Sequence, residues 1–388
     1  MPIGGIQVEL WGRQFSKQEI LQRVGDISQI GGVRSVELRE GSEAGVAAID
    51  FSSGSGLNFT VLPARGMDIA RLEFKDIPLA WRSSTGEVGP WYYEFSPAGW
   101  SRGFFGGLLA TCGLAAAGHA SVDEGQEFSL HGRASYIPAR NVMLDGYWEG
   151  DDYVMWAQGR VRESVPLGEN LSLTRKVWCR MGEKALHIRD TVENMGFAPA
   201  AHMLVYHMNF GFPLLDAGTE LVAPAHDVVS WDITWDQMLG AEMSRAIHEA
   251  STEEIERYHR FGPPQQPQYV NRVYNLVMGA DENGDVTVAL LNRGFPQGDG
   301  IGLYLKYSGR TLPEFTLWKV LQHQSYVVGL EPGNCRQGGR AAERTQGRLK
   351  VLEPAETVTY ELEVGVLETE TEFLAIEEHI AAARNGAK

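Results

Sequence analysis

Short apolar runs, each bounded by residues typical of turns, recur along most of the chain. Several alternate apolar and polar positions with a period of two, which is the pattern of a half-buried strand. In the run 171–180, the odd-numbered positions share one predicted face and the even-numbered positions share the other. The clearest runs are Val46–Phe51, Leu57–Leu62, Tyr153–Val161, Leu171–Arg180, Ala185–Glu193, Val286–Leu291, Ser325–Leu330 and Val358–Val366. The pattern predicts a mainly β protein, built as a large antiparallel β-sandwich with a few short helices.

Two capping-box sequences predict short helices outside the strand pattern. Ser16-x-x-Glu19 predicts one helix within an N-terminal extension that covers residues 1–30. Ser251-x-x-Glu254 predicts another within a helical insertion at 236–261, after a weaker helical stretch at 237–248. The insertion has two interpretations, a lid or interface on the one hand and a surface decoration on the other.

The strand pattern extends over residues 30–367, and a last helix is expected at 370–385. Between two apolar runs, Asp281-Glu-Asn-Gly-Asp285 predicts a hairpin turn, because Asn-Gly accepts the positive φ of tight turns. The sequence contains no Ser/Gly linker, charge block or internal repeat. Residues 1–388 are therefore expected to form a single domain.

The charge of the chain argues against several classes of partner. It carries 34 basic and 50 acidic residues, for a formal net charge of −16, and no Lys/Arg run offsets this charge. Such a surface repels phosphate backbones, so nucleic acid is not expected as a partner. No stretch of sequence is apolar for long enough to span a membrane, and no signal-peptide pattern begins the chain. We therefore expect a cytoplasmic protein without membrane contact.

Two polar residues at predicted strand ends are candidates for acid–base chemistry. His207 lies just before the Gly-Phe-Pro sequence that ends its strand, and Glu331 closes an apolar strand before a Pro-Gly turn. Histidine titrates near neutral pH, and partial burial raises the pKa of a carboxyl group into a useful range. The sequence contains none of the GxGxxG, P-loop, HExxH or GxSxG motifs that indicate other chemistries.

The other polar and aromatic residues near strand ends and glycine turns fit a sugar, which presents hydroxyl groups on its rim and C–H groups on its faces. Trp318 offers a stacking wall, and the remaining residues offer hydrogen-bonding groups. These candidate sugar-binding residues are Arg65, His131, Arg133, Asn209, Trp318, Lys319 and His323. Purely structural roles stay open: Arg65 could fix a turn, Arg133 could pair with a carboxylate, and Lys319 could lie on a solvated face.

Five ordered motifs together resemble the aldose 1-epimerase-like family, a branch of the galactose-mutarotase-like superfamily. They are Leu62-Pro-Ala-Arg-Gly-Met-Asp68, Ala110-Thr-Cys-Gly-Leu114, Leu130-His-Gly-Arg133, Tyr206-His-Met-Asn-Phe-Gly-Phe-Pro213 and Leu330-Glu-Pro-Gly-Asn-Cys335. The resemblance covers about residues 30–367. It implies a supersandwich of antiparallel strands with a sugar cleft on one concave face. In mutarotases the position of Tyr206 usually holds asparagine, and the continuation after Glu331 differs.

The resemblance also implies a mechanism. Glu331 would take the proton from the anomeric hydroxyl, while His207, as imidazolium, would protonate the ring oxygen. Ring opening, rotation about the C1–C2 bond and closure would give the other anomer. His131 and Arg65 would steady ring hydroxyls. This chemistry implies no cofactor and no metal.

Two other classes of function stay open from the sequence. One is a metal-assisted isomerase, epimerase or lyase acting on a keto-sugar, with His131, His207, His323 and Glu331 as ligands. The other is a non-catalytic sugar-binding protein on the same fold. The sequence does not decide which sugar or anomer is bound, whether it is phosphorylated, or whether the chain forms a homodimer.

Overall fold

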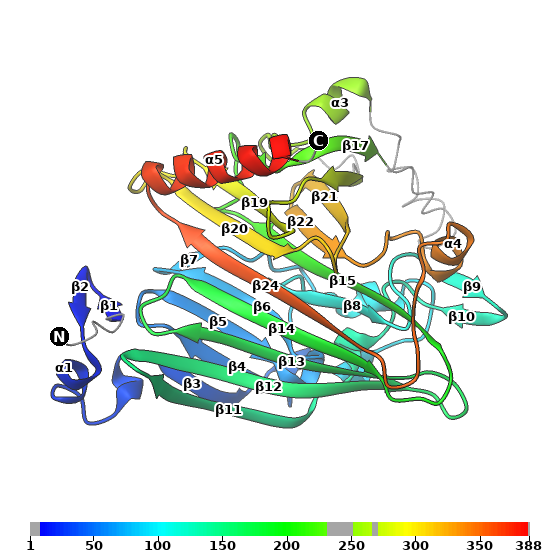
Figure 1. Cartoon of the computed structure of the whole chain (residues 1–388), viewed down its shortest axis with the longest axis horizontal. Helices are drawn as coiled ribbons and strands as arrows, with labels where there is room; N and C mark the ends of the chain where they lie inside the picture. Colours follow the sequence, from blue (N-terminus) through cyan, green and yellow to red (C-terminus); the bar gives the residue numbers. More distant parts are fainter. Residues whose placement is uncertain (1–7, 231–250, 266–270, 387–388) are drawn as a thin grey trace.

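The computed structural model describes residues 8–230, 251–265 and 271–386, and its largest element is a sheet of eight antiparallel strands (Figure 1). The order is β11 (Arg140–Glu149), β12 (Asp152–Ser164), β13 (Asn170–Arg180), β14 (Ala185–Asn194), β24 (Thr357–Leu367), β20 (Ile301–Ser308), β19 (Asp285–Asn292) and β16 (Glu220–Val222). The predicted alternation in β13 is confirmed, since its odd-numbered side chains are buried. The eight predicted strand runs all coincide with strands of the structure, except that Val46 lies one residue before its strand.

A second sheet of seven strands packs against the first. Its order is β17 (Ala225–Ser230), β18 (Asn271–Met278), β21 (Glu314–Gln322), β22 (Ser325–Gly333), β15 (Ala200–Gly211) and β23 (Lys350–Leu352), with β8 (Ala110–Leu114) also paired to β15. All twelve residues of β15 are buried, so both faces of this strand are covered. Tyr206, Met208 and Phe210 point into the main core, whereas His207 and Asn209 point to the opposite face.

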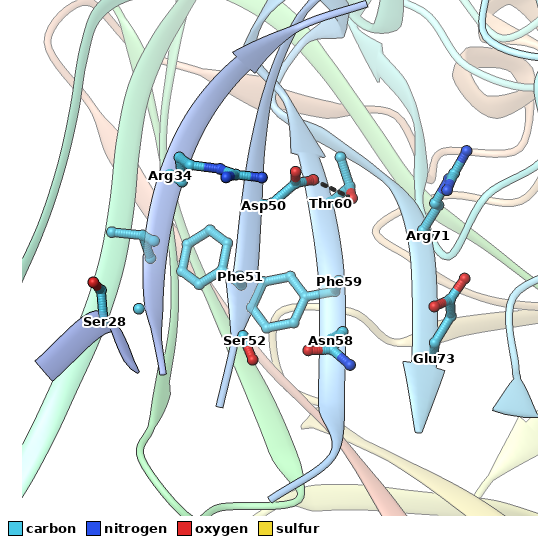
Figure 2. Close-up of a pocket in the computed structure, with 12 residues that line it drawn as sticks. Ser28, Arg34, Asp50, Phe51, Ser52, Asn58, Phe59, Thr60, Arg71 and Glu73 are labelled. Carbon is cyan, nitrogen blue, oxygen red and sulfur yellow. Dashed lines mark hydrogen bonds between the residues drawn. The ribbon is translucent and has the colours of Figure 1, made fainter. Parts of the chain in front are cut away.

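A third sheet of five strands extends the sandwich. It consists of β3 (Gly32–Glu37), β4 (Ala47–Ser52), β5 (Leu57–Leu62), β6 (Asp68–Phe74) and β7 (Ile77–Pro78). Phe51 and Phe59 stack with ring centroids 4.3 Å apart and are buried. The other face is a polar depression of about 440 Å³, in which the Thr60 hydroxyl donates to Asp50 over 2.8 Å (Figure 2). Two small hairpins, β1 (Val8–Leu10) with β2 (Arg13–Phe15) and β9 (Ser121–Asp123) with β10 (Gln126–Phe128), complete the strands of the described residues.

The described helices are few and lie at the edges of the sandwich. They are α1 (Lys17–Leu21), α3 (Thr252–Glu256), α4 (Arg340–Thr345) and α5 (Glu370–Gly386), together with the 3₁₀ turns Ile27–Gln29, Gly41–Glu43, Pro63–Arg65, Pro90–Tyr92, Gly99–Gly103 and Ala134–Tyr136. Both predicted capping boxes form, at the starts of α1 and α3. α5 begins where expected and lies across β19 and β20 (Figure 1). None of the helices in the described ranges is long and apolar enough to cross a membrane.

The turn predicted at Asp281–Asp285 forms, but it does not join two strands of a hairpin. In this turn the Asp281 carboxylate accepts from the backbone N–H groups of Asn283 and Asp285. The prediction of a hairpin there is wrong, because β18 and β19 on either side of the turn belong to different sheets. The turn instead carries the chain from one layer to the other. The helical stretch expected at 237–248 lies outside the described residues.

Candidate functional site

His207 and Glu331 face each other from neighbouring strands. In the register of β15 and β22, Val205 pairs with Gly333 and Met208 pairs with Leu330, which places His207 opposite Glu331. Side chains directly opposite each other in an antiparallel pair lie on the same face and in contact. Nε2 of His207 is 3.3 Å from Oε1 of Glu331. The two side chains that were expected to cooperate are therefore together, and only 5% of His207 and 1% of Glu331 is exposed.

Gly329 leaves the space that the Glu331 carboxyl group occupies. Gly329 lies two residues before Glu331 on β22, on the same face, and pairs with Trp318 of β21. A Cβ atom at Gly329 would lie 2.4 Å from Oε1 of Glu331 and 3.1 Å from Cβ of Trp318. The absence of a side chain at this position thus lets the carboxyl group lie between the indole of Trp318 and the imidazole of His207.

Aromatic rings surround the pair. The centroid of the His207 ring is 5.3 Å from that of Trp318, 5.1 Å from that of Phe104 and 6.0 Å from that of Trp100. Trp81 extends this group of rings: its ring centroid is 6.1 Å from that of Trp318 and 6.0 Å from that of Phe104. Flat apolar rings around polar groups match the alternating C–H faces and hydroxyl rim of a sugar.

His131 completes the polar part of the site. Its ring centroid is 5.6 Å from that of His207 and 4.6 Å from that of Trp100. His131 has a φ of +56°, in the left-handed region that residues other than glycine rarely adopt. It is followed by Gly132, whose φ is +68°. Two backbone hydrogen bonds fix this turn: the His131 N–H donates to Gly118 over 2.7 Å, and the His131 carbonyl accepts from Gly113 over 3.1 Å.

Several buried polar atoms around the pair lack a partner. Within the described part of the chain, these are Nδ1 of His131, Nδ1 of His207, Nε1 of Trp100 and Oδ1 of Asn209. Buried polar groups are nearly always hydrogen-bonded, so these atoms are the donors and acceptors that a polar ligand or a water molecule would satisfy. The Asn209 amide nitrogen is already committed, since it donates to the backbone carbonyls of Gly107 and His207.

Burial controls the protonation of the pair. It raises the pKa of Glu331 to about 8, although the hydrogen bond from Gln337 partly opposes the shift. Burial also lowers the pKa of His207 to about 4, and it brings the pKa of His131 well below its ordinary value. At neutral pH the proton of the pair therefore resides on Glu331. This reverses the expected distribution, in which His207 was the imidazolium and Glu331 the carboxylate.

Arg65 was expected to contact sugar hydroxyls, but it lies elsewhere. Its guanidinium is buried and donates to the backbone carbonyls of Ser135, Val88 and Gly103. It also lies over the ring of Tyr136, 4.1 Å from the centroid. Its role is to tie three loop segments together, which is the structural alternative considered for this residue.

Arg133, Lys319 and His323 also lie outside the cluster. Arg133 pairs with the buried carboxylate of Glu163 at 3.1 Å. Lys319 follows Trp318 on β21 and therefore points to the other face, where its ammonium lies 4.8 Å from the ring centroid of Phe261. His323 is exposed in the turn between β21 and β22. Of the nine predicted site residues, His207, Glu331, His131, Trp318 and Asn209 come together.

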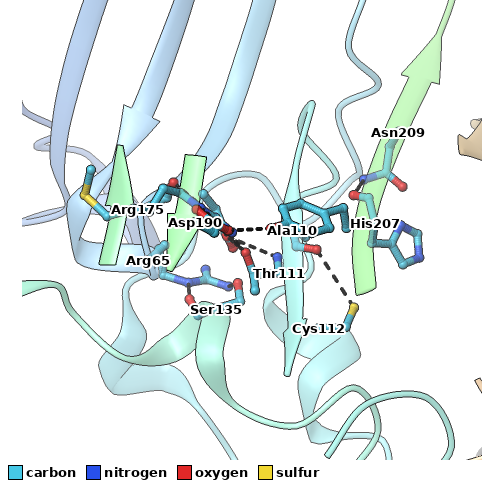
Figure 3. Close-up of polar contacts among 12 residues, drawn as sticks. Arg65, Ala110, Thr111, Cys112, Ser135, Arg175, Asp190, His207 and Asn209 are labelled. Carbon is cyan, nitrogen blue, oxygen red and sulfur yellow. Dashed lines mark hydrogen bonds and ion pairs between the residues drawn. The ribbon is translucent and has the colours of Figure 1, made fainter. Parts of the chain in front are cut away.

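An ionic network stabilises the strands behind the site. Arg175 on β13 forms three hydrogen bonds with Asp190 of β14, the shortest at 2.6 Å, and donates to the Thr111 hydroxyl over 2.8 Å. The Tyr206 hydroxyl donates to Asp190 over 2.7 Å. Figure 3 shows this network on one side of β8 and His207 on the other. Because Thr111 and Tyr206 pair in the register of β8 and β15, the network fixes the strand pair that carries His207.

The structure adds residues to the site that the sequence did not indicate. Trp100 and Phe104 come from a loop around the 3₁₀ turn Gly99–Gly103, which has no strand or helix periodicity. Trp81 lies just before a bridge to Gly106, and its backbone N–H donates to Asn209. Gln337 comes from the connection between β22 and α4, and its side chain donates to Oε2 of Glu331. No local pattern marks any of these residues, because their contacts join distant parts of the chain.

The four predicted metal ligands do not form a metal-binding group, although His131, His207 and Glu331 lie near one another. Among the residues that the structure describes, no three His, Cys, Asp or Glu side chains are arranged so as to hold a metal ion. His323, one of the four candidates for such a site, lies in an exposed turn. The geometry of these donors therefore gives the metal-assisted alternative no support.

Comparisons with known proteins agree with this fold. The model of a family described as a domain of unknown function (DUF4432) matches residues 43–366. No curated protein matches the chain. A solved structure of a putative aldose 1-epimerase from Klebsiella pneumoniae is 26% identical, with a TM-score of 0.81, over 92% of this chain and 88% of its own.

Two further solved structures are more distant. A galactose mutarotase-like protein from Clostridium acetobutylicum is 11% identical, with a TM-score of 0.57, over 88% of this chain and 100% of its own. A galactose 1-epimerase from Lactobacillus acidophilus is also 11% identical, with a TM-score of 0.55, over the same shares. The chain thus has the galactose mutarotase-like β-sandwich fold.

Proposed function

The chain belongs to the DUF4432 family, and we propose its activity from the geometry of the site. The protein is an aldose 1-epimerase-like enzyme that interconverts the anomers of a sugar by general acid–base catalysis. The observation that carries this proposal is the 3.3 Å separation of His207 Nε2 and Glu331 Oε1 inside a ring of aromatic side chains. The likeness to a putative aldose 1-epimerase supports it.

The two side chains are placed for a concerted transfer of two protons. The anomeric hydroxyl and the ring oxygen are bonded to the same carbon, so two groups in mutual contact can reach both. His207 takes the proton from the anomeric hydroxyl, and Glu331 gives its proton to the ring oxygen. The bond between C1 and the ring oxygen breaks, and C1 becomes a carbonyl carbon. After rotation about the C1–C2 bond, the reverse transfers close the ring on the other face.

The proton balance of this cycle suits a buried site. The pair holds one proton before ring opening, on Glu331, and one proton afterwards, on His207. Its net charge is the same in both states, and the ion pair formed on ring opening has its two charges in contact. The walls formed by Trp318 and Trp100 would orient the sugar, and orientation of reacting groups adds to acid–base catalysis.

The pH dependence of the reaction follows from the two pKa values. The active form needs neutral His207, whose pKa is about 4, and protonated Glu331, whose pKa is about 8. We expect kcat/KM to be constant between these values and to fall about tenfold per pH unit outside them. The measurement is exchange between α and β anomers by proton NMR, corrected for the spontaneous rate at each pH. Constant kcat/KM up to pH 10 would contradict the role of Glu331.

A substitution at Gly329 tests the placement of the carboxyl group. The added methyl group in Gly329→Ala would lie 2.4 Å from Oε1 of Glu331, so the tip of the glutamate side chain must move. We expect a loss of about tenfold or more in kcat/KM, since catalytic groups need close positioning, with a thermal unfolding midpoint near that of the parent. Gly25→Ala, at a position after α1 where an added Cβ meets nothing within 4 Å, is the control and is expected to keep its activity. Full activity in Gly329→Ala would show that the carboxyl position is unimportant.

A panel of monosaccharides tests the function itself. Anomer exchange is followed for aldoses, keto-sugars and their phosphates, together with the shift of the unfolding midpoint that each compound causes. The proposal predicts catalysed exchange of at least one sugar. A sugar that stabilises the protein without any catalysed exchange would instead identify a sugar-binding protein.

A further inference from the structure

Gln337 is the second polar contact of the Glu331 carboxyl group. β22 ends at Gly333, and the chain then runs to α4, which begins at Arg340. Gln337 lies in this connection with 8% of its surface exposed, and its amide nitrogen donates a short hydrogen bond to Oε2 of Glu331. The other carboxyl oxygen, Oε1, is the one that faces His207. The two oxygens of Glu331 are therefore in different environments.

The backbone holds Gln337 firmly in this place. Its carbonyl accepts from the His119 N–H over 2.9 Å. Gly118, with a φ of +77°, approaches so closely that a Cβ atom there would lie 2.4 Å from the same carbonyl oxygen. The carbonyl of Gly118 in turn accepts from His131 over 2.7 Å. One short segment thus supports both Gln337 and the turn that presents His131.

We propose that Gln337 is a positioning residue that fixes the proton of Glu331 on Oε1, the oxygen that faces His207. An amide N–H directed at Oε2 requires that oxygen to act as an acceptor. A carboxyl proton on Oε2 would occupy the position in which this oxygen accepts the hydrogen bond of Gln337. The carboxyl proton therefore lies on Oε1. There it lies beside Nε2 of His207, and the acid gives it from this oxygen to the ring oxygen of the sugar. The inference rests on the proposed acid–base function, because it assigns the atom from which the acid acts.

The proposal predicts the direction in which loss of Gln337 moves the titration of Glu331. A donor to Oε2 stabilises the carboxylate more than the neutral acid, so Gln337→Met should raise the titration midpoint by about one pH unit. If the amide were turned so that its oxygen accepted a proton from Oε2, the same substitution would lower the midpoint. The sign of the shift therefore separates the two arrangements.

The experiment is an infrared titration of the protonated carboxyl band, which Glu331→Gln identifies by removing it. We expect the midpoint of this band to rise in Gln337→Met and to stay unchanged in Gln346→Met, a matched change at an exposed glutamine at the end of α4. Should Gln337→Met fail to fold, Gln337→Asn keeps the amide but is too short to reach, and the same rise is expected. An unchanged or lowered midpoint overturns the proposal.

Anomer exchange supplies the second measurement. The alkaline limb of kcat/KM should move upward with the carboxyl titration in Gln337→Met, which a merely structural role would not cause. A wild-type protein that catalyses no anomer exchange would refute the proposed function, but the infrared shift would still decide the position of the proton. Failure of the inference and failure of the function are therefore distinguishable.

Discussion

Glu331→Gln is expected to lower the rate of anomer exchange by about 10²- to 10⁴-fold, which is the usual contribution of one general acid–base group. Gln has nearly the same shape, and its side-chain oxygen can still accept the hydrogen bond from Gln337. It has no proton of suitable acidity to give to the ring oxygen, so the chemical step slows while binding of the sugar persists. The expected signature is a large fall in kcat with a KM near that of the wild type, measured by NMR exchange.

A matched control separates the loss of one acid from a general effect of charge removal. Glu361 lies on β24, where it pairs with Arg189 and 56% of its side chain is exposed. Glu361→Gln makes the same chemical change far from the aromatic side chains that surround His207, and we expect an unchanged rate of anomer exchange. Equal rates for Glu331→Gln, Glu361→Gln and wild type would exclude Glu331 from the reaction.

Arg175→Met is expected to destabilise the protein by about 3–5 kcal/mol, the usual result of removing one member of a buried ion pair. Neither Arg175 nor Asp190 has any exposed side-chain surface, and removal of the guanidinium leaves the Asp190 carboxylate buried without a counter-charge. The Tyr206 hydroxyl and the backbone groups of the surrounding strands carry no positive charge, so they cannot replace the guanidinium. The free energy of unfolding is measured by urea denaturation.

The neighbouring pair on the same sheet is the control. Arg189 of β14 bonds to Glu361 of β24 with more than half of both side chains exposed. Exposed pairs contribute about 1 kcal/mol or less, so Arg189→Met should change the unfolding free energy by no more than that. Similar losses for Arg175→Met and Arg189→Met would show that the buried network does not stabilise the fold.

The sequence pattern located the eight strands named from it but not their partners. The two-residue period located β13 and β14, because burial of one sheet face leaves its mark at every second residue. It could not show that β18 and β19, which flank the Asp281 turn, enter different sheets. Pairing depends on contacts between distant segments, and no local signal records those contacts.

The residues of the candidate site were likewise predictable from the sequence only in part. His207 and Glu331 were found from their positions at strand ends and from the family resemblance, but their facing register required the structure. Lys319 could have been set aside from the sequence, since it follows Trp318 on one strand and adjacent residues face opposite sides. Arg65 could not, because a glycine turn does not reveal whether the arginine side chain points into a site or back to loop carbonyls.

The most direct measurement is the rate of anomer exchange for wild type, His207→Gln, Glu331→Gln and the double variant on one sugar that the wild type converts. Groups that act as a unit lose nearly all of their effect when either is removed. We therefore predict that each single variant falls to within a few-fold of the double variant. Two losses that multiply in the double variant, or a wild-type rate equal to that of buffer for every sugar, would contradict the paired action of His207 and Glu331.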